Sequence, residues 1–201
     1  MSGTVPSASS PPAVPAPGPG DGRRVAAFFD VDRTLLRCNS GSKWLDHLRR
    51  NGEISTWYSL RAATWLLRYK LALVDMEAVI DKVMAELRGE EEAPMWEKVR
   101  RWMEVEIFHE VAPAGRERIA WHRAEGHELA ILSASSPYLT EPLARHLGID
   151  HVLCTRPLVE NGRFSGRHVK PACFGAGKVH WAERFAAERG VDLDRSWFYT
   201  D

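Results

Sequence analysis

Two aspartates spaced two residues apart, Asp30 and Asp32, are the residues of this sequence best suited to chemistry. They follow Val25-Ala-Ala-Phe-Phe29, a short apolar run typical of a strand buried on both faces of a parallel sheet. The carboxyl ends of such strands face the crevice where open α/β sheets bind ligands. One carboxylate there can attack phosphorus while the other handles the proton of the leaving group. The pattern therefore predicts covalent phosphoryl transfer.

The segment Asp30-Val-Asp32-Arg-Thr34 resembles the DxDxT motif of the haloacid dehalogenase-like phosphatases, in particular subfamily IB, the phosphoserine-phosphatase-like branch. Three further features of that family follow in the same order. They are an apolar strand ending in Ser133, a helix opened by Lys178, and an aromatic strand ending in Asp201. The resemblance runs from about Val25 to Asp201, and an ordered set of motifs is far more specific than a single match.

The resemblance implies a role for each of these residues. Asp30 would be the nucleophile and a metal ligand. Asp32 would be the general acid and base, and would bind the metal through its backbone carbonyl. Ser133 would bind phosphate, and Lys178 would neutralise phosphoryl charge. Asp201 would place a further carboxylate on the metal.

The same resemblance implies Mg²⁺ as the cofactor and small phosphomonoesters as the substrates. Because one anion attacks another, a hard cation with oxygen ligands is needed to neutralise phosphoryl and carboxylate charge together. Thr34 would support the loop or the phosphate. Hydrolysis would proceed in two steps through an aspartyl phosphate on Asp30. A phosphotransferase or mutase that uses the same intermediate is an alternative.

The sequence departs from the family pattern in two places. The family usually continues past Asp201 into a second acidic residue and more core strands, so we expect this chain to be a fragment or truncated. If the end is genuine, a non-catalytic metal-binding, phosphate-binding or scaffold protein is the alternative. Phosphoserine phosphatases also carry a glutamate shortly after the first motif that meets the substrate amino group. This chain has Cys38-Asn39-Ser40 there, which disfavours phosphoserine as the substrate.

Each assignment has a simpler structural alternative. An Asp-x-Asp pair after a strand can be a plain turn, and a terminal aspartate is by default solvated. Ser133 could be an ordinary strand-end hydroxyl, with Ser135 or Ser136 as the N-cap of the next helix. Lys170 is the rival of Lys178, although two glycines directly before Lys178 favour the latter. The ordered set favours function over coincidence.

Helical patterns fill residues 42–110, which we expect to form a cap that closes over the site and excludes water. One apolar stripe, with Asp75 as N-cap and Gly89 as C-cap, consists of Met76, Val79, Ile80, Val83, Met84 and Leu87. Further helices are predicted near Lys43 to Arg50, Thr56 to Leu73 and Met95 to Phe108. The aromatic and basic residues of the second could bind a membrane surface, but a place in the cap core is favoured.

Residues 23–41 and 111–201 predict a three-layer α/β core with a Rossmann-like parallel sheet, into which the cap is inserted after the first motif. Helices are expected from Pro113 to Glu125, Pro137 to Leu147 and Lys178 to Arg189, and strands from Glu128 to Leu132, Val152 to Cys154 and Ser196 to Thr200. Asn161-Gly162, between Pro157-Leu-Val-Glu160 and Arg163-Phe-Ser165, predicts a type I′ hairpin.

Composition excludes several classes of protein. Lys plus Arg equals Asp plus Glu, and no basic run supplies the footprint of nucleic-acid binding. Residues 1–22 are Pro, Gly and Ser rich, which predicts a disordered tail without a secretory signal. The most apolar stretch, Trp57 to Val74, contains three basic residues, so no transmembrane helix is expected.

Three unpaired cysteines favour a reducing compartment, the cytoplasm. The histidines show no metal-site spacing, and the oligomeric state is left open.

Overall fold

The computed structural model describes residues 22–54 and 76–201. Nearly all of the predicted tail, the predicted helix from Thr56 to Leu73 and the predicted cap residue Asp75 lie outside the described residues. Within the described ranges, no helix is long and apolar enough to cross a membrane.

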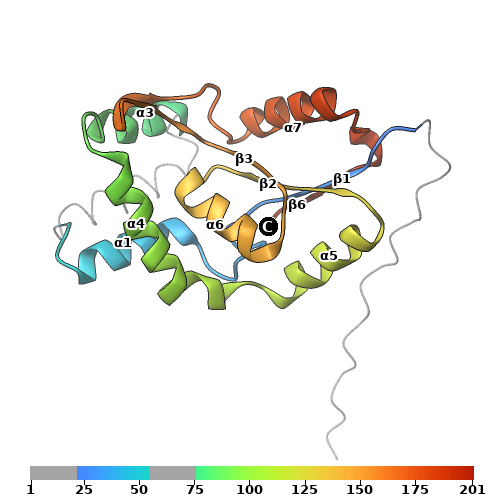
Figure 1. The fold of residues 1–201 in the computed structure, drawn as a ribbon, viewed down its shortest axis with the longest axis horizontal. Helices are drawn as coiled ribbons and strands as arrows, with labels where there is room; N and C mark the ends of the chain where they lie inside the picture. Colours follow the sequence, from blue (N-terminus) through green and yellow to red (C-terminus); the bar gives the residue numbers. More distant parts are fainter. Residues whose placement is uncertain (1–21, 55–75) are drawn as a thin grey trace, which may run out of the picture.

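A four-stranded parallel sheet forms the centre of the fold (Figure 1). Its strands are β1 (Ala26–Phe29), β2 (Glu128–Ser133), β3 (His151–Cys154) and β6 (Trp197–Tyr199), in the order β3-β2-β1-β6. The chain adds β2 and β3 on one side of β1 and then returns to add β6 on the other side. A reversal of this kind opens a ligand crevice at the carboxyl ends of the central strands. Asp30 stands at that point, directly after β1.

Helices cover both faces of the sheet. On one face, α5 (Pro113–Ala124) and α6 (Pro137–Leu147) pack in a core that includes Ala27 and Phe29. On the other face, α7 (Ala176–Arg189) packs in a core that includes Ala26 and Phe28. Successive side chains of a strand point to opposite faces, so the all-buried run of β1 serves both cores. The predicted three-layer α/β fold is confirmed.

Described cap helices are α1 (Ser40–Arg50), α3 (Met76–Glu86) and α4 (Glu92–Trp102). Helix α1 begins two residues before the expected boundary at 42. The helix predicted from Met95 to Phe108 begins earlier, at Glu92, and continues as a π-helical turn (Met103–Ile107) and a 3-10 turn (Phe108–Glu110). Met103 and Ile107 are fully buried in the main core, so this irregular end of the cap is fixed by tertiary packing.

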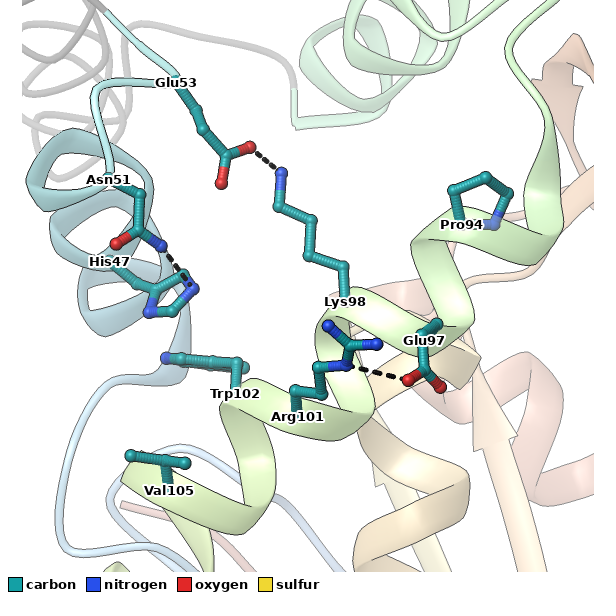
Figure 2. Close-up of a pocket in the computed structure, with 9 residues that line it drawn as sticks. All are labelled: His47, Asn51, Glu53, Pro94, Glu97, Lys98, Arg101, Trp102 and Val105. Carbon is teal, nitrogen blue, oxygen red and sulfur yellow. Dashed lines mark hydrogen bonds and ion pairs between the residues drawn. The ribbon is translucent and has the colours of Figure 1, made fainter.

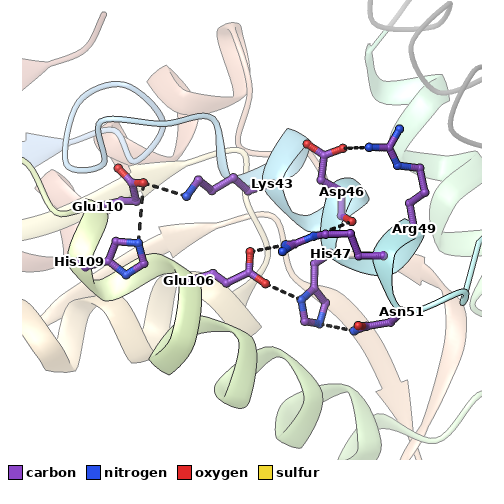
Figure 3. A network of polar contacts seen from close by, with 9 residues as sticks. Lys43, Asp46, His47, Arg49, Asn51, Glu106, His109 and Glu110 are labelled. Atoms are coloured by element: carbon purple, nitrogen blue, oxygen red, sulfur yellow. Dashed lines mark hydrogen bonds and ion pairs between the residues drawn. The ribbon is translucent and has the colours of Figure 1, made fainter.

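Ion pairs and hydrogen bonds join α1 to the α4 side of the cap (Figure 3). Glu106 lies 2.8 Å from Nδ1 of His47 and 2.6 Å from the guanidinium of Arg50, and Lys43 donates to Glu110 at 2.8 Å. Between the two helices lies a pocket whose lining residues include His47 and Trp102 (Figure 2). Polar contacts therefore connect α1 to the π-helical and 3-10 turns that follow α4.

The two chain segments that cross between core and cap pair with each other. Leu36 and Val111 form an antiparallel bridge. The backbone N–H of Arg37 donates to the carbonyl of Glu110 at 2.9 Å, and that of Ala112 donates to Leu35 at 2.8 Å. We call the paired residues 35–37 and 110–112 the crossover.

The predicted hairpin is present as β4 (Pro157–Glu160) and β5 (Arg163–His168). Asn161 and Gly162 have φ values of 51° and 75°, as the positive φ of both central residues in a type I′ turn requires. The hairpin is attached to the cap by backbone hydrogen bonds, because Gly89 N–H donates to Phe164 and Phe164 N–H donates to Glu90. The N–H of Glu92 donates to Gly162.

A fully buried histidine, His122 of α5, packs beneath the sheet edge. Its Nδ1 lies 2.8 Å from Nδ1 of His127, and its Nε2 lies 2.9 Å from the hydroxyl of Tyr199. Burial, together with the charges of the nearby His127 and Arg118, lowers the pKa of His122 from 6.5 to about 4. The histidine is therefore neutral in the folded protein at neutral pH.

This neutral histidine predicts a loss of stability in mild acid. Below pH 6.5 the unfolded chain takes up a proton that the folded chain accepts only near pH 4, so the free energy of unfolding falls across that interval. The expected loss is up to about 3 kcal/mol, because one pKa unit corresponds to about 1.4 kcal/mol. Urea unfolding between pH 7 and pH 4 should show a flatter pH dependence for His122→Gln. The exposed His180→Gln should behave like the unmodified chain, and identical slopes for all three proteins would contradict the assignment.

Candidate active site

Asp30 lies at the carboxyl end of β1, between the two neighbouring strands. Its N–H donates to the carbonyl of Tyr199 at 2.9 Å, which extends the pairing of β1 with β6 by one residue. One carboxylate oxygen accepts the N–H of Val31 at 2.7 Å, and the other lies 2.5 Å from Nζ of Lys178. The Asp30 and Lys178 side chains are 18% and 15% exposed. The ion pair therefore sits in a mostly buried but accessible place.

Lys178 reaches Asp30 because the start of α7 packs very closely against the preceding loop. A Cβ atom on Gly177 would lie 1.8 Å from the carbonyl oxygen of Ala172, so only glycine fits there. Gly175, before the helix, has a φ of 52°. Lys170, the alternative lysine, instead lies 2.8 Å from Asp81 of the cap helix α3. The structure thus brings Lys178, and not Lys170, to Asp30.

The Asp32 carboxylate is hydrogen-bonded to the N-terminal end of the cap helix α1. One carboxylate oxygen accepts the backbone N–H of Ser40 at 2.8 Å, and the other accepts the side-chain amide of Asn39 at 3.1 Å. Burial raises the pKa of Asp32, hydrogen bonds from Ser40 oppose the rise, and the charges of Asp30 and Asp201 add to it. A carboxyl group with a raised pKa can hold a proton for delivery.

Ser133 and Thr34, the two hydroxyl residues predicted to bind phosphate, are buried and half-buried, respectively. Ser133 ends β2, is 3% exposed, and its hydroxyl accepts the N–H of Ser135 at 3.3 Å. Ser136 occupies the N-cap position of α6 but makes no side-chain capping bond. The Thr34 hydroxyl is buried and has no hydrogen-bond partner in the described part of the chain. Both hydroxyls have hydrogen-bonding capacity that a phosphate group could use.

Asp201 is exposed, and its carboxylate lies 3.8 Å from the guanidinium of Arg33. Its charge acts on Asp32, so the three aspartates share one electrostatic neighbourhood. Arg33 itself has a φ of 57°, an unusual value for a residue other than glycine. The turn after β1 is therefore held in a specific conformation between Asp30 and the start of α1.

Sequence reasoning missed two residues at this site. Asn39 and Ser40 stand where the sequence departs from the family pattern, and both hydrogen-bond to Asp32. The available signal was Asn39 itself, because asparagine before a helix is a common N-cap. Its side-chain oxygen does accept the N–H of Ser42 at 2.9 Å.

The donor set expected from the family resemblance would suit a hard cation. The carboxylates of Asp30 and Asp201, with the backbone carbonyl of Asp32, offer oxygen atoms only, and Mg²⁺ completes such sets with water and phosphate oxygens. Lys178 and Arg33 are positioned against these carboxylates. Within residues 22–54 and 76–201, no three side chains of His, Cys, Asp or Glu are grouped to hold a metal. The expected set does not require three, because one of its ligands is a carbonyl.

Comparison with known proteins gives a consistent result. Residues 27–201 match the family model described as "haloacid dehalogenase-like hydrolase". A protein of Mycobacterium tuberculosis described as "Probable phosphatase" is 27% identical over 198 residues, covering 96% of this chain and 67% of its own length.

Solved structures share the fold. A Bordetella pertussis protein of unknown function superposes with a TM-score of 0.76 at 26% identity, covering 88% of this chain and 81% of its own. A phosphoserine phosphatase, solved as an analogue of its phospho-aspartyl intermediate, superposes with a TM-score of 0.61 at 16% identity, covering 88% and 77%. The likeness to phosphoserine phosphatases confirms the predicted fold class.

The close packing at Gly177 gives a test of how Lys178 is positioned. In Gly177→Ala the new methyl group collides with the backbone of Ala172, so α7 must shift. We expect the free energy of unfolding to fall by about 1–3 kcal/mol, and a crystal structure to show Lys178 displaced from Asp30.

Gly41→Ala is the matched control for this prediction. Gly41 also lies in a helix, but an added methyl group meets only the Asn39 side chain, at an ordinary 3.5 Å. We expect no loss of stability there, because alanine in a helix is more favourable than glycine by about 0.5–1 kcal/mol. Equal stability of the two variants, with Lys178 still against Asp30 in the crystal structure of Gly177→Ala, would contradict this role of Gly177.

Proposed function

Because this chain belongs to the haloacid dehalogenase-like hydrolase family, we propose that it is a Mg²⁺-dependent phosphatase that hydrolyses small phosphomonoesters through an aspartyl phosphate on Asp30. One observation carries the proposal. The Asp30 carboxylate lies 2.5 Å from the Lys178 ammonium group, and Asp32, with its raised pKa, stands two residues away. One site would thus supply a nucleophile, a cation for the phosphoryl group and a proton donor.

In the first step, a carboxylate oxygen of Asp30 attacks phosphorus and the ester P–O bond breaks. Asp32 gives its proton to the departing alcohol oxygen, so the alcohol leaves neutral. The raised pKa of Asp32 supports this direction of transfer. The Lys178 ammonium group and the Ser133 and Thr34 hydroxyls would bind the phosphoryl oxygens.

In the second step, Asp32 has become a carboxylate and takes a proton from water. The water oxygen forms a bond to phosphorus, the bond between phosphorus and Asp30 breaks, and inorganic phosphate leaves. Asp32 is then protonated again and Asp30 is again a free carboxylate, so both aspartates have returned to their starting states. We propose that the cap, about residues 42–110, closes over core segments 23–41 and 111–201 and limits access of water during the first step, while Asp30 attacks the phosphoryl group.

The metal would be held by the carboxylates of Asp30 and Asp201 and the carbonyl of Asp32. Bound there, Mg²⁺ would neutralise the negative charge that builds up when a carboxylate approaches a phosphate. We place the reaction in the cytoplasm, because the three cysteines are free thiols. A phosphotransferase would follow the same first step and pass the phosphoryl group to an alcohol in place of water.

The proposal predicts a phosphatase activity that requires both the metal and Asp30. With p-nitrophenyl phosphate and a panel of small phosphomonoesters, the chain should release phosphate in Mg²⁺ and lose activity when EDTA is added. Asp30→Asn keeps the shape of the side chain but removes the nucleophile, so kcat/KM should fall about a thousandfold or more. Circular dichroism should show that the variant is folded.

The outcomes separate the alternatives. Activity that survives both EDTA and Asp30→Asn would contradict the mechanism. Transfer of phosphate to an added alcohol, detected as a new ester, would indicate a phosphotransferase. A folded chain that binds Mg²⁺ in calorimetry and hydrolyses no ester would support a binding or scaffold role.

A further inference from the structure

Asn39 connects two parts of the protein that have different tasks. Its side-chain amide nitrogen donates to the Asp32 carboxylate at 3.1 Å, while its side-chain oxygen accepts the N–H of Ser42 at 2.9 Å. The first contact reaches a residue of the core motif, and the second caps the first turn of α1 in the cap. One side chain therefore touches both sides of the crossover.

The orientation of the Asn39 amide follows from its neighbours. A backbone N–H only donates, so the Ser42 N–H must face the side-chain oxygen of Asn39, and the amide nitrogen then faces Asp32. The opposite orientation would place oxygen against the Asp32 carboxylate and nitrogen against the Ser42 N–H, so both bonds would be lost. The two contacts therefore fix each other.

The Ser40 backbone strengthens the same arrangement. Ser40 is 2% exposed, and its N–H donates to the second oxygen of Asp32 at 2.8 Å. Both oxygens of the carboxylate are thus held by the first residues of the cap. The intervening chain returns in a compact turn, in which the N–H of Arg33 donates to the carbonyl of Cys38 at 3.1 Å.

We propose that Asn39 is a positioning residue that fixes the carboxyl group of Asp32 for proton transfer and ties its orientation to that of the cap helix α1. The inference rests on the proposed function, in which Asp32 protonates the leaving group. It adds a specific mechanical link, because a rotation of α1 about the crossover moves the two donors that hold the acid. Asp32 can then deliver its proton only when α1 holds the orientation in which Asn39 and Ser40 bind the Asp32 carboxyl group.

The decisive variant is Asn39→Ser. Serine retains a good N-cap for the Ser42 N–H, since both residues are favoured at that position, but its shorter side chain does not reproduce the amide donor to Asp32. The readout is the ratio of kcat/KM for two esters of similar size, phenyl phosphate and p-nitrophenyl phosphate. The first leaving group needs a proton and the second leaves readily without one.

We expect Asn39→Ser to reduce kcat/KM about tenfold or more for phenyl phosphate and less than about threefold for p-nitrophenyl phosphate. Thermal unfolding should be nearly unchanged. Asn39→Asp keeps the shape and the cap but turns an oxygen toward Asp32, and should show at least the same selective loss. Asp192→Ala is the control, because Asp192 is also an N-cap, accepting the Asp194 N–H, but lies far from Asn39 in the sequence. This variant should change neither the activity nor the ratio of kcat/KM between the two esters.

Equal losses for the two esters, or no loss, would overturn the proposal, because a purely structural role lowers both activities alike. Crystal structures provide a second test, which does not depend on enzyme activity. The Asp32 carboxylate should accept a hydrogen bond from Asn39 in the unmodified chain and should be reoriented in Asn39→Ser. An unmodified chain that hydrolyses neither ester contradicts the proposed function, whereas an unmoved Asp32 contradicts the positioning role of Asn39.

Discussion

The ion pair between Lys178 and Asp30 joins residues 148 positions apart in the sequence. Both groups are mostly buried, and a buried charge without a partner is costly. Each therefore constrains the other: the end of β1 must face the start of α7, and α7 must approach the sheet closely enough for a lysine to reach it. The missing Cβ of Gly177 permits that approach, and the core around Phe28 and Phe185 maintains it.

The cap depends on the same strand through the turn that follows Asp30. This turn carries Asp32, continues into the crossover at Leu36 and ends where α1 begins at Ser40. Since Asp32 is bound by the first residues of α1, the chemistry and the cap share one short piece of chain. The carboxyl end of β1 thus organises both the core site and the approach of the cap.

The regular part of this structure was predictable because its physical signals are local. Buried strands, glycine stops after α5, α6 and α7, and the Asn161-Gly162 turn each follow from a few adjacent residues. The meeting of Lys178 with Asp30 was expected only through the resemblance of the motifs to a known family. No local rule predicts it, because it depends on packing between segments distant in the sequence.

Other features escaped prediction for the same reason. The π-helical turn after Trp102 follows from burial of Met103 and Ile107 in the core, which periodicity alone does not reveal. Arg33, in the turn between Asp30 and Asn39, has a positive φ, a conformation that arginine rarely takes and sequence rules do not assign.

The backbone hydrogen bonds between the β4–β5 hairpin and the turn before α4 bear on how such a protein can be altered by recombination. The hairpin lies in the C-terminal half of the sequence, yet it pairs through Phe164 with Gly89 and Glu90 of the inserted segment. These bonds use main-chain atoms, so they require the backbone paths of the hairpin and of the turn before α4 to match each other. An exchange of residues 42–110 with those of a relative would replace only one partner of this interface. The module that can be transferred intact is therefore discontinuous and includes the hairpin.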